Sequence, residues 1–217
     1  AEAAALGLDP GFSVLDSADA EELMAQQRLA LGLAGRSVAA HRVPTAAVCL
    51  AIHARCVATG QPLAEVLRLH FPWCQLPGDD DSRTLASLFA AYGNAKLQQR
   101  LLDYDDLLDA WQLALQQGPV AERRRARFDH VLVDEVQDLN PLQWRIVELL
   151  RPGGRGLTAV GDDAQAIYGF RGAAVAGMLG FPARCSPPAR VLVLTINHRS
   201  TPQIVASSNA VIAQATE

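Results

Sequence analysis

Lysine is nearly absent from this sequence: Lys96 is the single lysine among 19 basic residues, and the other 18 are arginine. Together with the many alanines, this bias is typical of a GC-rich bacterial genome and does not by itself indicate a function. The formal net charge of −4 argues against a basic protein that coats DNA, because phosphate neutralisation supplies most non-specific affinity. A narrow single-strand track of a few arginines and aromatic rings is compatible with this charge.

Long apolar runs are also missing. No run approaches the roughly 18–20 residues that cross a bilayer, and residues 1–7 lack the basic and apolar regions of a signal peptide. We therefore expect a cytoplasmic protein of bacterial type with no membrane partner. The chain has no initial methionine and begins within an expected helix, so we also expect it to be part of a longer protein.

The four cysteines form no Cys-x-x-Cys pair, and this sparse spacing is typical of reduced thiols in the cytoplasm. Cys49, His53 and Cys56 are spaced by four and three residues, so they share one face of a helix. A metal site with His70 or Cys74 as a fourth ligand is one interpretation. The favoured interpretation is that these residues pack on the inner face of the helix.

The first half of the chain has the pattern of a helical block. The expected helices cover residues 17–31, 44–59, 62–69 and 84–117. Asp16 or Ser17 is the expected cap of the first helix, and a break near Gly93 or Leu102 divides the last stretch. Phe12–Leu15 precedes the block and is expected to be extended.

After residue 128, apolar runs alternate with helical patterns. The runs predict three buried strands at residues 128–134, 157–160 and 191–195. Capping boxes that begin at Asn140 and Ser200 predict the starts of two helices. Because strands alternate with helices, the expected fold class is α/β, with a parallel sheet into which the helical block is inserted.

The strongest chemical signal is the apolar strand that ends in Asp134 and Glu135, which is a Walker B arrangement. Ligands bind at the carboxyl ends of strands in open α/β sheets. There, the first acid can hold Mg²⁺ and the second can orient and deprotonate an attacking water. The alternative is a pair of solvated acids at a strand end, which Gln137 and Asp138 make less favourable.

Two further segments carry polar and aromatic side chains. The strand that ends at Gly161 and Asp162 leads into a loop with one amide, two aromatic rings and one arginine, which suits base stacking and backbone contact. In the alternative, the rings of this loop fold back on the core. The third segment places Arg199 after a strand and before a helix, where an arginine can reach a phosphate.

In this order and spacing, the segments resemble the motifs of the UvrD/Rep/PcrA group of superfamily 1 helicases. Residues 134–138 are similar to motif II, residues 160–173 to motif III and residues 194–200 to motif IV. Residues 102–108 resemble the Asp-aromatic-Asp-Asp-Leu segment where that family's chain re-enters its core. Residues 12–16 resemble the segment that enters the helical insertion.

The resemblance implies a fold and a cofactor. The fold would be a partial RecA-like P-loop NTPase core, a parallel sheet with an inserted all-helical subdomain. Residues 1–16 and 102–195 would belong to the first motor domain, residues 17–101 to the insertion and residues 196–217 to the second motor domain. ATP and Mg²⁺ would be the ligands, with Asp134 holding the metal and Glu135 activating water.

The resemblance also assigns the remaining site residues. Gln165 would sense the γ-phosphate, and Arg199 would contact it from the second motor domain. His198 stands where the family has a tyrosine that stacks on adenine, and this departure weakens the stacking surface. Contacts to single-stranded DNA would come from Tyr168, Phe170 and Arg171, with Phe170 in the place of the family's tryptophan.

One essential part of such a site is missing from the sequence. The phosphate loop, Gly-x-x-x-x-Gly-Lys-Ser/Thr, needs a lysine that reaches the β- and γ-phosphates. Lys96 follows no glycine and precedes no serine or threonine. We therefore expect a fragment that is inactive as an ATPase alone, and whose partners include single-stranded DNA and the missing parts of its own motor domains.

Three functions remain under consideration. The first is a fragment of an ATP-dependent DNA helicase or translocase that moves 3′ to 5′. The second is the motor part of a helicase–nuclease, and the third is a non-catalytic module that binds single-stranded DNA or a partner protein. Intact Glu135, Gln165 and Arg199 favour the first two, because a non-catalytic module has no chemical use for them.

Overall fold

The computed structural model describes residues 3, 6–33, 37–38, 41–42, 44–74 and 80–214, and of these the side chains of 37, 38, 41, 42, 80, 81 and 171 lie outside the description. The helices are α1 (Ser17–Ala30), α2 (Ala46–Thr59), α3 (Leu63–His70), α4 (Asp80–Gln99), α5 (Tyr104–Gln116), α6 (Gly118–Arg125), α7 (Pro141–Leu150), α8 (Val175–Arg184) and α9 (Pro202–Ile212). The strands are β1 (Ser13–Val14), β2 (Ser37–Val38), β3 (His41–Arg42), β4 (Leu101–Leu102), β5 (Val131–Val133) and β6 (Leu157–Ala159). The chain is therefore a mixture of helices and small sheets.

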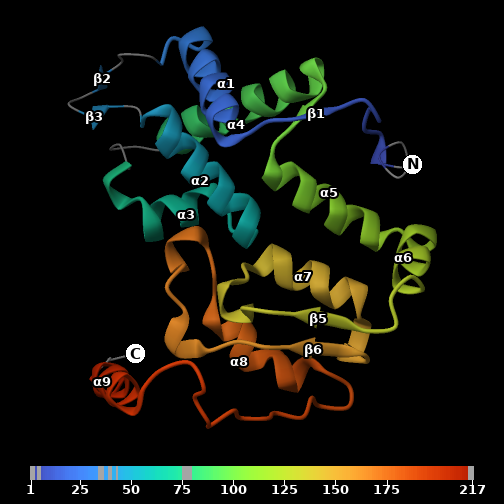
Figure 1. Cartoon of the computed structure of the whole chain (residues 1–217). Coiled ribbons are helices and arrows are strands. Elements are labelled where there is room, and N and C mark those ends of the chain that lie inside the picture. Colours follow the sequence, from blue (N-terminus) through green and yellow to red (C-terminus); the bar gives the residue numbers. More distant parts are fainter. Residues whose placement is uncertain are drawn as a thin grey trace.

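Helices α1 to α4 form a helical block around a shared apolar core (Figure 1). Asp16 caps α1, as expected, by accepting hydrogen bonds from the N–H groups of Ala18 and Asp19. Helix α2 ends at Gly60, whose φ of 71° is the left-handed conformation that glycine adopts without strain. The most deeply buried apolar side chains of this core are Met24, Cys49, Ile52, Val66, Leu88 and Tyr92.

Strands β1 and β4 pair in parallel, with Ser13 opposite Leu101 and Val14 opposite Leu102. The chain thus enters and leaves the helical block through neighbouring strands. The predicted break near Leu102 is confirmed, because β4 separates α4 from α5. A break near Gly93 is wrong: α4 continues through this position, where an added Cβ atom would meet no other atom within 4 Å.

A buried ion cluster joins the end of the block to α5. Nζ of Lys96 lies 2.6 Å from Oδ2 of Asp103 and 2.6 Å from Oδ2 of Asp106. The same two aspartates form the capping box of α5, and the hydroxyl of Tyr92 donates to Asp103. Burial opposes ionisation of Asp103, but hydrogen bonds from Lys96 and from the Asp106 N–H lower its pKa. The single lysine is therefore a structural cation.

The second lobe contains β5 and β6, which pair in parallel with Val131 opposite Leu157 and Val133 opposite Ala159. Helix α7 lies between this pair and helices α2 and α5 (Figure 1). Its predicted capping box is confirmed: the N–H of Gln143 donates to Asn140 Oδ1 at 2.9 Å, and the N–H of Asn140 donates back to Gln143 Oε1 at 3.0 Å. Leu115, Leu142 and Ile146 form the core between α5 and α7.

Helix α8 packs on α7. The rings of Trp144 and Phe181 lie 5.6 Å apart between centroids, and Arg184 Nε forms an ion pair with Glu148 at 2.8 Å. Gly177 of α8 faces the Trp144 indole so closely that any Cβ atom there would collide with it. These contacts fix the part of the chain that follows β6.

Two expectations about the fold are wrong. Residues 37–38 and 41–42, within the block expected to be all-helical, form the antiparallel pair β2–β3. Residues 191–195 form no strand: they are extended and unpaired (Figure 1), and Leu194 is 90% exposed. An apolar run becomes a strand only where a neighbouring backbone completes its hydrogen bonds, and in the described chain β6 pairs only with β5.

The last helix also begins differently from the expectation. Thr201, not Ser200, is the N-cap of α9, and its side chain makes no capping hydrogen bond. The helix itself covers most of the expected stretch. Instead of Ser200, the side chain of Asn197 organises this turn, since its Oδ1 accepts from the N–H groups of Arg199 and Ser200 at 2.9 and 2.8 Å.

Candidate functional site

The candidate site lies where β5 and β6 end side by side. Asp134 and Glu135 follow β5, and Gly161 and Asp162 follow β6. A backbone hydrogen bond joins the segments that follow the two strands: the N–H of Val136 donates to the carbonyl oxygen of Val160 at 3.0 Å. The structure thus brings the acids of the first segment to the loop of the second.

Both acids are exposed at this edge. Asp134 Oδ1 accepts a hydrogen bond from the N–H of Glu135 at 2.9 Å. Glu135 has a φ of 51°, the left-handed region that non-glycine residues rarely adopt. Such strained conformations cluster at functional sites, where the surrounding structure maintains them.

The side chain of Gln137 links the segment after β5 to the segment after β6. Its side chain is 2% exposed. Nε2 of Gln137 donates to Oε2 of Glu135 at 2.7 Å, and Oε1 accepts from the N–H of Asp162 at 3.1 Å. Gly161 makes this approach possible, because a Cβ atom there would lie 2.6 Å from Gln137 Oε1. Sequence reasoning gave Gln137 no role.

Gln165 lies on the short turn that follows β6. Its Nε2 donates to Asp162 Oδ2 at 2.6 Å, while Asp162 Oδ1 caps the turn by accepting from the N–H of Ala164 at 3.0 Å. Asp162 therefore connects three groups: the Gln137 amide through its own backbone, the turn, and the Gln165 side chain. The structure places Gln165 on the same loop edge as the acids.

The aromatic part of this loop is open to solvent. Phe170 is 72% exposed, and its ring lies 5.9 Å from the ring of Tyr168 with 48° between their planes. The interpretation in which both rings fold back on the core is therefore wrong for Phe170. Tyr168 is partly buried. The side chain of Arg171 lies outside the described residues.

Helix α2 supports the same loop. Nη1 of Arg55 donates to the carbonyl oxygens of Gly169 and Phe170, both at 3.0 Å. Gly172, with a φ of +86°, then passes close to Thr59 and Ala58 at the end of α2. Arg55 was missed by sequence reasoning, and no local signal reveals it, since its partners are more than a hundred residues away.

His198 and Arg199 lie on the exposed segment before α9. In the described part of the chain, neither makes a hydrogen bond or an ion pair with Asp134, Glu135 or Gln165. In the described chain, the side-chain hydrogen bonds of the turn that carries them are those in which Asn197 Oδ1 accepts from the N–H groups of Arg199 and Ser200. The structure thus joins Asp134, Glu135 and Gln165 through Asp162 and Gln137, whereas neither His198 nor Arg199 is bonded to these three residues in the described chain.

The cysteine and histidine face of α2 is a packing surface. Cys49 is fully buried, and burial raises the pKa of its thiol to about 11. The ring of His53 packs edge-on against Phe89 and Tyr92, and burial lowers its pKa. No group of three metal-ligating side chains occurs among the residues whose positions are described. The favoured packing interpretation is confirmed by these contacts.

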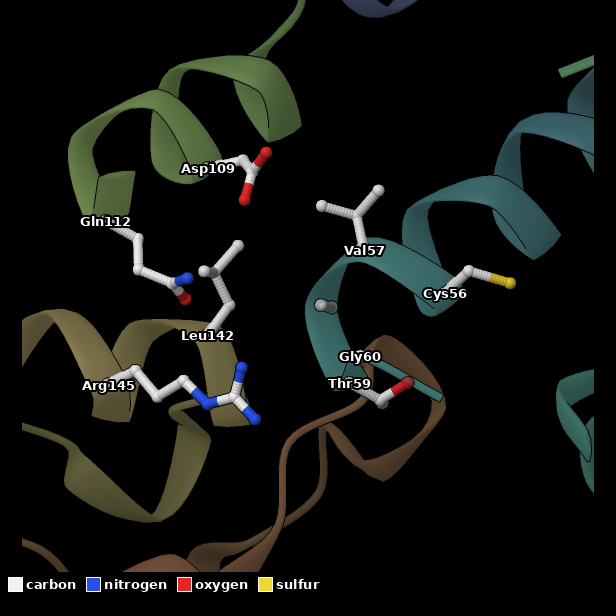
Figure 2. A pocket seen from close by; sticks show the side chains of 9 residues that line it. Cys56, Val57, Thr59, Gly60, Asp109, Gln112, Leu142 and Arg145 are labelled. Carbon is white, nitrogen blue, oxygen red and sulfur yellow. The ribbon is translucent and has the colours of Figure 1, made fainter. Parts of the chain in front are cut away.

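A separate pocket of about 260 Å³ lies at the junction of α2, α5 and α7. Figure 2 shows Asp109, Gln112 and Arg145 around it, with the apolar side chains of Val57 and Leu142. Oε1 of Gln112 is buried there without a hydrogen-bond partner among the described residues. None of the predicted site residues lines this pocket.

None of the helices in the described ranges has the length and apolar character needed to cross a membrane.

Part of this chain is similar in sequence to known ATP-dependent DNA helicases. The ATP-dependent DNA helicase UvrD1 of Mycobacterium leprae is 39% identical over 147 residues, covering 63% of this chain and 19% of the relative. UvrD1 of Mycobacterium tuberculosis is 40% identical over 144 residues (63% and 18%), and the ATP-dependent DNA helicase PcrA of Staphylococcus aureus is 34% identical over 140 residues (64% and 19%). The chain spans about a fifth of the length of these relatives.

A family model described as the UvrD/REP helicase N-terminal domain matches residues 1–186, which include the acids after β5, the loop after β6 and the helical block between β1 and β4. With a match of this extent, the chain belongs to the UvrD/REP helicase N-terminal domain family.

Proposed function

We propose that this chain is part of an ATP-dependent DNA helicase that moves 3′ to 5′ on single-stranded DNA, and that it supplies the magnesium and water half of the ATP site. The observation that carries this proposal is the joining of Glu135 to the loop after β6 through the buried amide of Gln137. An ATPase that moves on DNA needs such a connection between its hydrolytic group and its DNA-facing surface.

The proposal includes a division of the chain. Residues 1–16 and 102–195 form part of a RecA-like motor domain, residues 17–101 an inserted helical subdomain and residues 196–217 the start of a second motor domain. Support comes from the parallel pairing of β1 with β4, the two segments that flank residues 17–101. An insertion is expected to leave and re-enter its parent domain at neighbouring points.

Asp134 has the character of a Mg²⁺ ligand. One oxygen of its exposed carboxylate accepts from the Glu135 N–H, and the other makes no hydrogen bond in the described chain. Mg²⁺ is commonly held by one or two carboxylates together with waters and substrate phosphates, so Asp134 fits without a larger cluster. The bound ion would neutralise charge on the phosphates.

Glu135 is the proposed base. Its carboxylate is exposed, and Gln137 holds only one of its two oxygens. The other oxygen is available to orient a water molecule and to accept its proton as the water attacks the γ-phosphate. Gln165, held by Asp162 on the adjacent loop, is positioned to sense that phosphate. His198 and Arg199 make no hydrogen bond or ion pair with these residues in the described chain, and their proposed partners are adenine for His198 and the γ-phosphate for Arg199.

Single-stranded DNA is the proposed partner of the loop after β6. The exposed ring of Phe170, beside Tyr168 and the backbone of Arg171, offers a stacking surface to bases. Arg55 holds this surface in place from α2. The loop proposed to contact DNA is then connected to Glu135 through the hydrogen bonds of Gln137.

The phosphate loop has to come from outside these 217 residues, because the sequence contains no Gly-x-x-x-x-Gly-Lys-Ser/Thr. The partners of this chain therefore include the remaining parts of its own motor domains. The proposed location of the protein is the cytoplasm. Without them, the isolated chain does not hydrolyse ATP. Magnesium-dependent turnover by the purified 217-residue chain would contradict this point.

The decisive experiment measures ATP turnover by the full-length protein that contains this chain, with and without single-stranded DNA. The wild type is compared with Glu135→Gln, which keeps the shape of the side chain and removes its basicity. The proposal expects DNA-stimulated turnover that falls by about 10²–10⁴-fold in the variant, the usual contribution of a general base.

The other outcomes separate the alternatives. Turnover accompanied by degradation of the DNA identifies the motor part of a helicase–nuclease. DNA binding without any turnover in the wild type identifies a non-catalytic module and contradicts the proposal. Unwinding of a duplex with a 3′ overhang, but not of one with a 5′ overhang, tests the direction of movement.

A further inference from the structure

We propose that Gln137 is a positioning residue that transmits the state of the DNA-facing loop to the base Glu135. This inference rests on the proposed function and goes beyond it, because it names the group that couples the two parts of the site. Gln137 itself touches neither nucleotide nor DNA, since its side chain is buried beneath the edge of the sheet.

The two ends of the Gln137 amide have different partners. Its NH₂ group donates to Glu135 Oε2 at 2.7 Å, and its oxygen accepts from the backbone N–H of Asp162 at 3.1 Å. Only a side chain with a donor and an acceptor at its tip can make both bonds. Burial also keeps water from replacing either bond, so the connection depends on this one amide.

Asp162 is the entry to the DNA-facing loop. Its side chain caps the turn at Ala164 and holds Gln165, and the turn leads directly to Tyr168 and Phe170. A movement of this turn therefore displaces the N–H of Asp162, which donates to Gln137 Oε1. A displaced amide in turn moves its NH₂ group relative to the Glu135 carboxylate, whose exposed side chain has no other hydrogen bond in the described chain.

The energetic consequence concerns orientation. A carboxylate on a flexible side chain loses rate when its geometry is not fixed, and a misplacement of about 1 Å can cost on the order of 10²-fold. When DNA holds the loop, Gln137 fixes Glu135 in its productive position. Removal of this amide should therefore lower kcat in the presence of DNA while leaving the binding of ATP nearly intact.

The first test uses Gln137→Leu in the full-length protein, a change that keeps the volume and removes both hydrogen bonds. We expect kcat with saturating oligo(dT) to fall by about 10–100-fold, the range found when groups that orient metal-ligating side chains are removed. The KM for ATP should change little, and the basal rate without DNA should fall much less. The ratio of stimulated to basal turnover is thus the quantity that reports the coupling.

Gln137→Glu separates the two ends of the amide. The new carboxylate still accepts from the Asp162 N–H, and when ionised it has no proton to donate to Glu135. Because two facing carboxylates can share a proton, turnover is measured at alkaline pH, where both are ionised. If the bond to Glu135 carries the coupling, this variant loses DNA stimulation as fully as Gln137→Leu. Retained stimulation in Gln137→Glu would show that the bond to Glu135 is dispensable.

Gly161→Ala displaces the side-chain amide of Gln137 without changing Gln137 itself. The added Cβ atom would lie 2.6 Å from Gln137 Oε1 and 2.8 Å from Val136 Cγ2, so the amide has to shift. This variant should also lose DNA stimulation. Gly93→Ala is the matched control, because a Cβ atom at that position meets nothing within 4 Å and the ratio should remain that of the wild type.

Three results overturn the inference. They are an unchanged stimulation ratio in Gln137→Leu, equal losses of basal and stimulated turnover, and a loss explained by unfolding in a parallel thermal melt. An inactive wild type is a different outcome, because it contradicts the proposed function itself. An active, DNA-stimulated wild type with an unaffected Gln137→Leu variant leaves the proposed function in place and removes the coupling role.

Discussion

Nη1 of Arg55 lies 3.0 Å from the carbonyl oxygen of Phe170, so a side chain of the helical block holds the backbone of a loop 115 residues later in the chain. The same nitrogen also donates to the carbonyl oxygen of Gly169. Hydrogen bonds that involve a charged group contribute roughly 1.5–3 kcal/mol. The position of the exposed Phe170 ring therefore depends on α2 as well as on the loop itself.

Arg55→Ala should weaken the binding of single-stranded DNA by on the order of 10-fold or more, because loss of its two charge-assisted bonds releases the loop. The measurement is fluorescence anisotropy with labelled oligo(dT). Arg68→Ala removes the same charge from an exposed position on α3 and is the control. Equal losses in both variants would show that Arg55 acts through its charge and not through the loop.

Phe170→Ala should cost about 1–3 kcal/mol of DNA affinity, the range for one stacked base. Phe170→Trp keeps a stacking face and should bind at least as well as the wild type. Trp73→Ala, which removes an exposed ring from the helical block, serves as the control and should change little. An unaffected Phe170→Ala variant would place the DNA elsewhere on the molecule.

Lys96→Met should destabilise the fold by about 3–5 kcal/mol, because it leaves the buried carboxylate of Asp103 and the partly exposed carboxylate of Asp106 without their cation. Urea unfolding followed by circular dichroism measures this difference. Arg100→Met removes an exposed ion pair with Asp9, at 3.1 Å, and should cost at most about 1 kcal/mol. Similar losses in the two variants would contradict the structural role of Lys96.

Asp105 gives the fold a pH dependence of known sign. Burial, and then the charge of Asp103, raise the pKa of Asp105 from 3.8 to about 6. Its native carboxyl group holds a proton more tightly than the unfolded chain does, so its contribution to stability falls as pH rises from about 4 to about 6. Above that range, the full cost of the buried charge is present.

Asp105→Asn should therefore stabilise the protein at pH 7, by at most about 3 kcal/mol, and this advantage should disappear near pH 4. The measurement is the free energy of unfolding in urea at both pH values. Asp109→Asn, at an exposed position on the same helix, is the control. A gain that is the same at pH 4 and pH 7 would show that ionisation is not its cause.

Local chemistry made many element boundaries predictable. Asp16 caps α1 and Asn140 caps α7, because both act on N–H groups within three residues of themselves. The acids after β5 were likewise identified from their position at the end of an apolar strand. Their pairing with the loop after β6 follows from the parallel arrangement of two neighbouring strands.

Other features depend on partners that the local sequence does not reveal. Residues 191–195 have the composition of a buried strand, yet they stay extended and exposed because no strand lies beside them in the described chain. Arg55 and Gln137 are ordinary polar residues in their own segments. Their roles arise from distant partners, the loop carbonyls for Arg55 and the Asp162 N–H for Gln137.

The burial of Lys96 also has a chemical consequence. It is the only lysine in the sequence, it is 3% exposed and it is held by two carboxylates. Acylating reagents that attack amines therefore find no accessible ε-amino group while α4 and α5 remain packed. In the purified 217-residue chain, which has no other lysine, modification of Lys96 becomes a direct reporter of the opening of this junction.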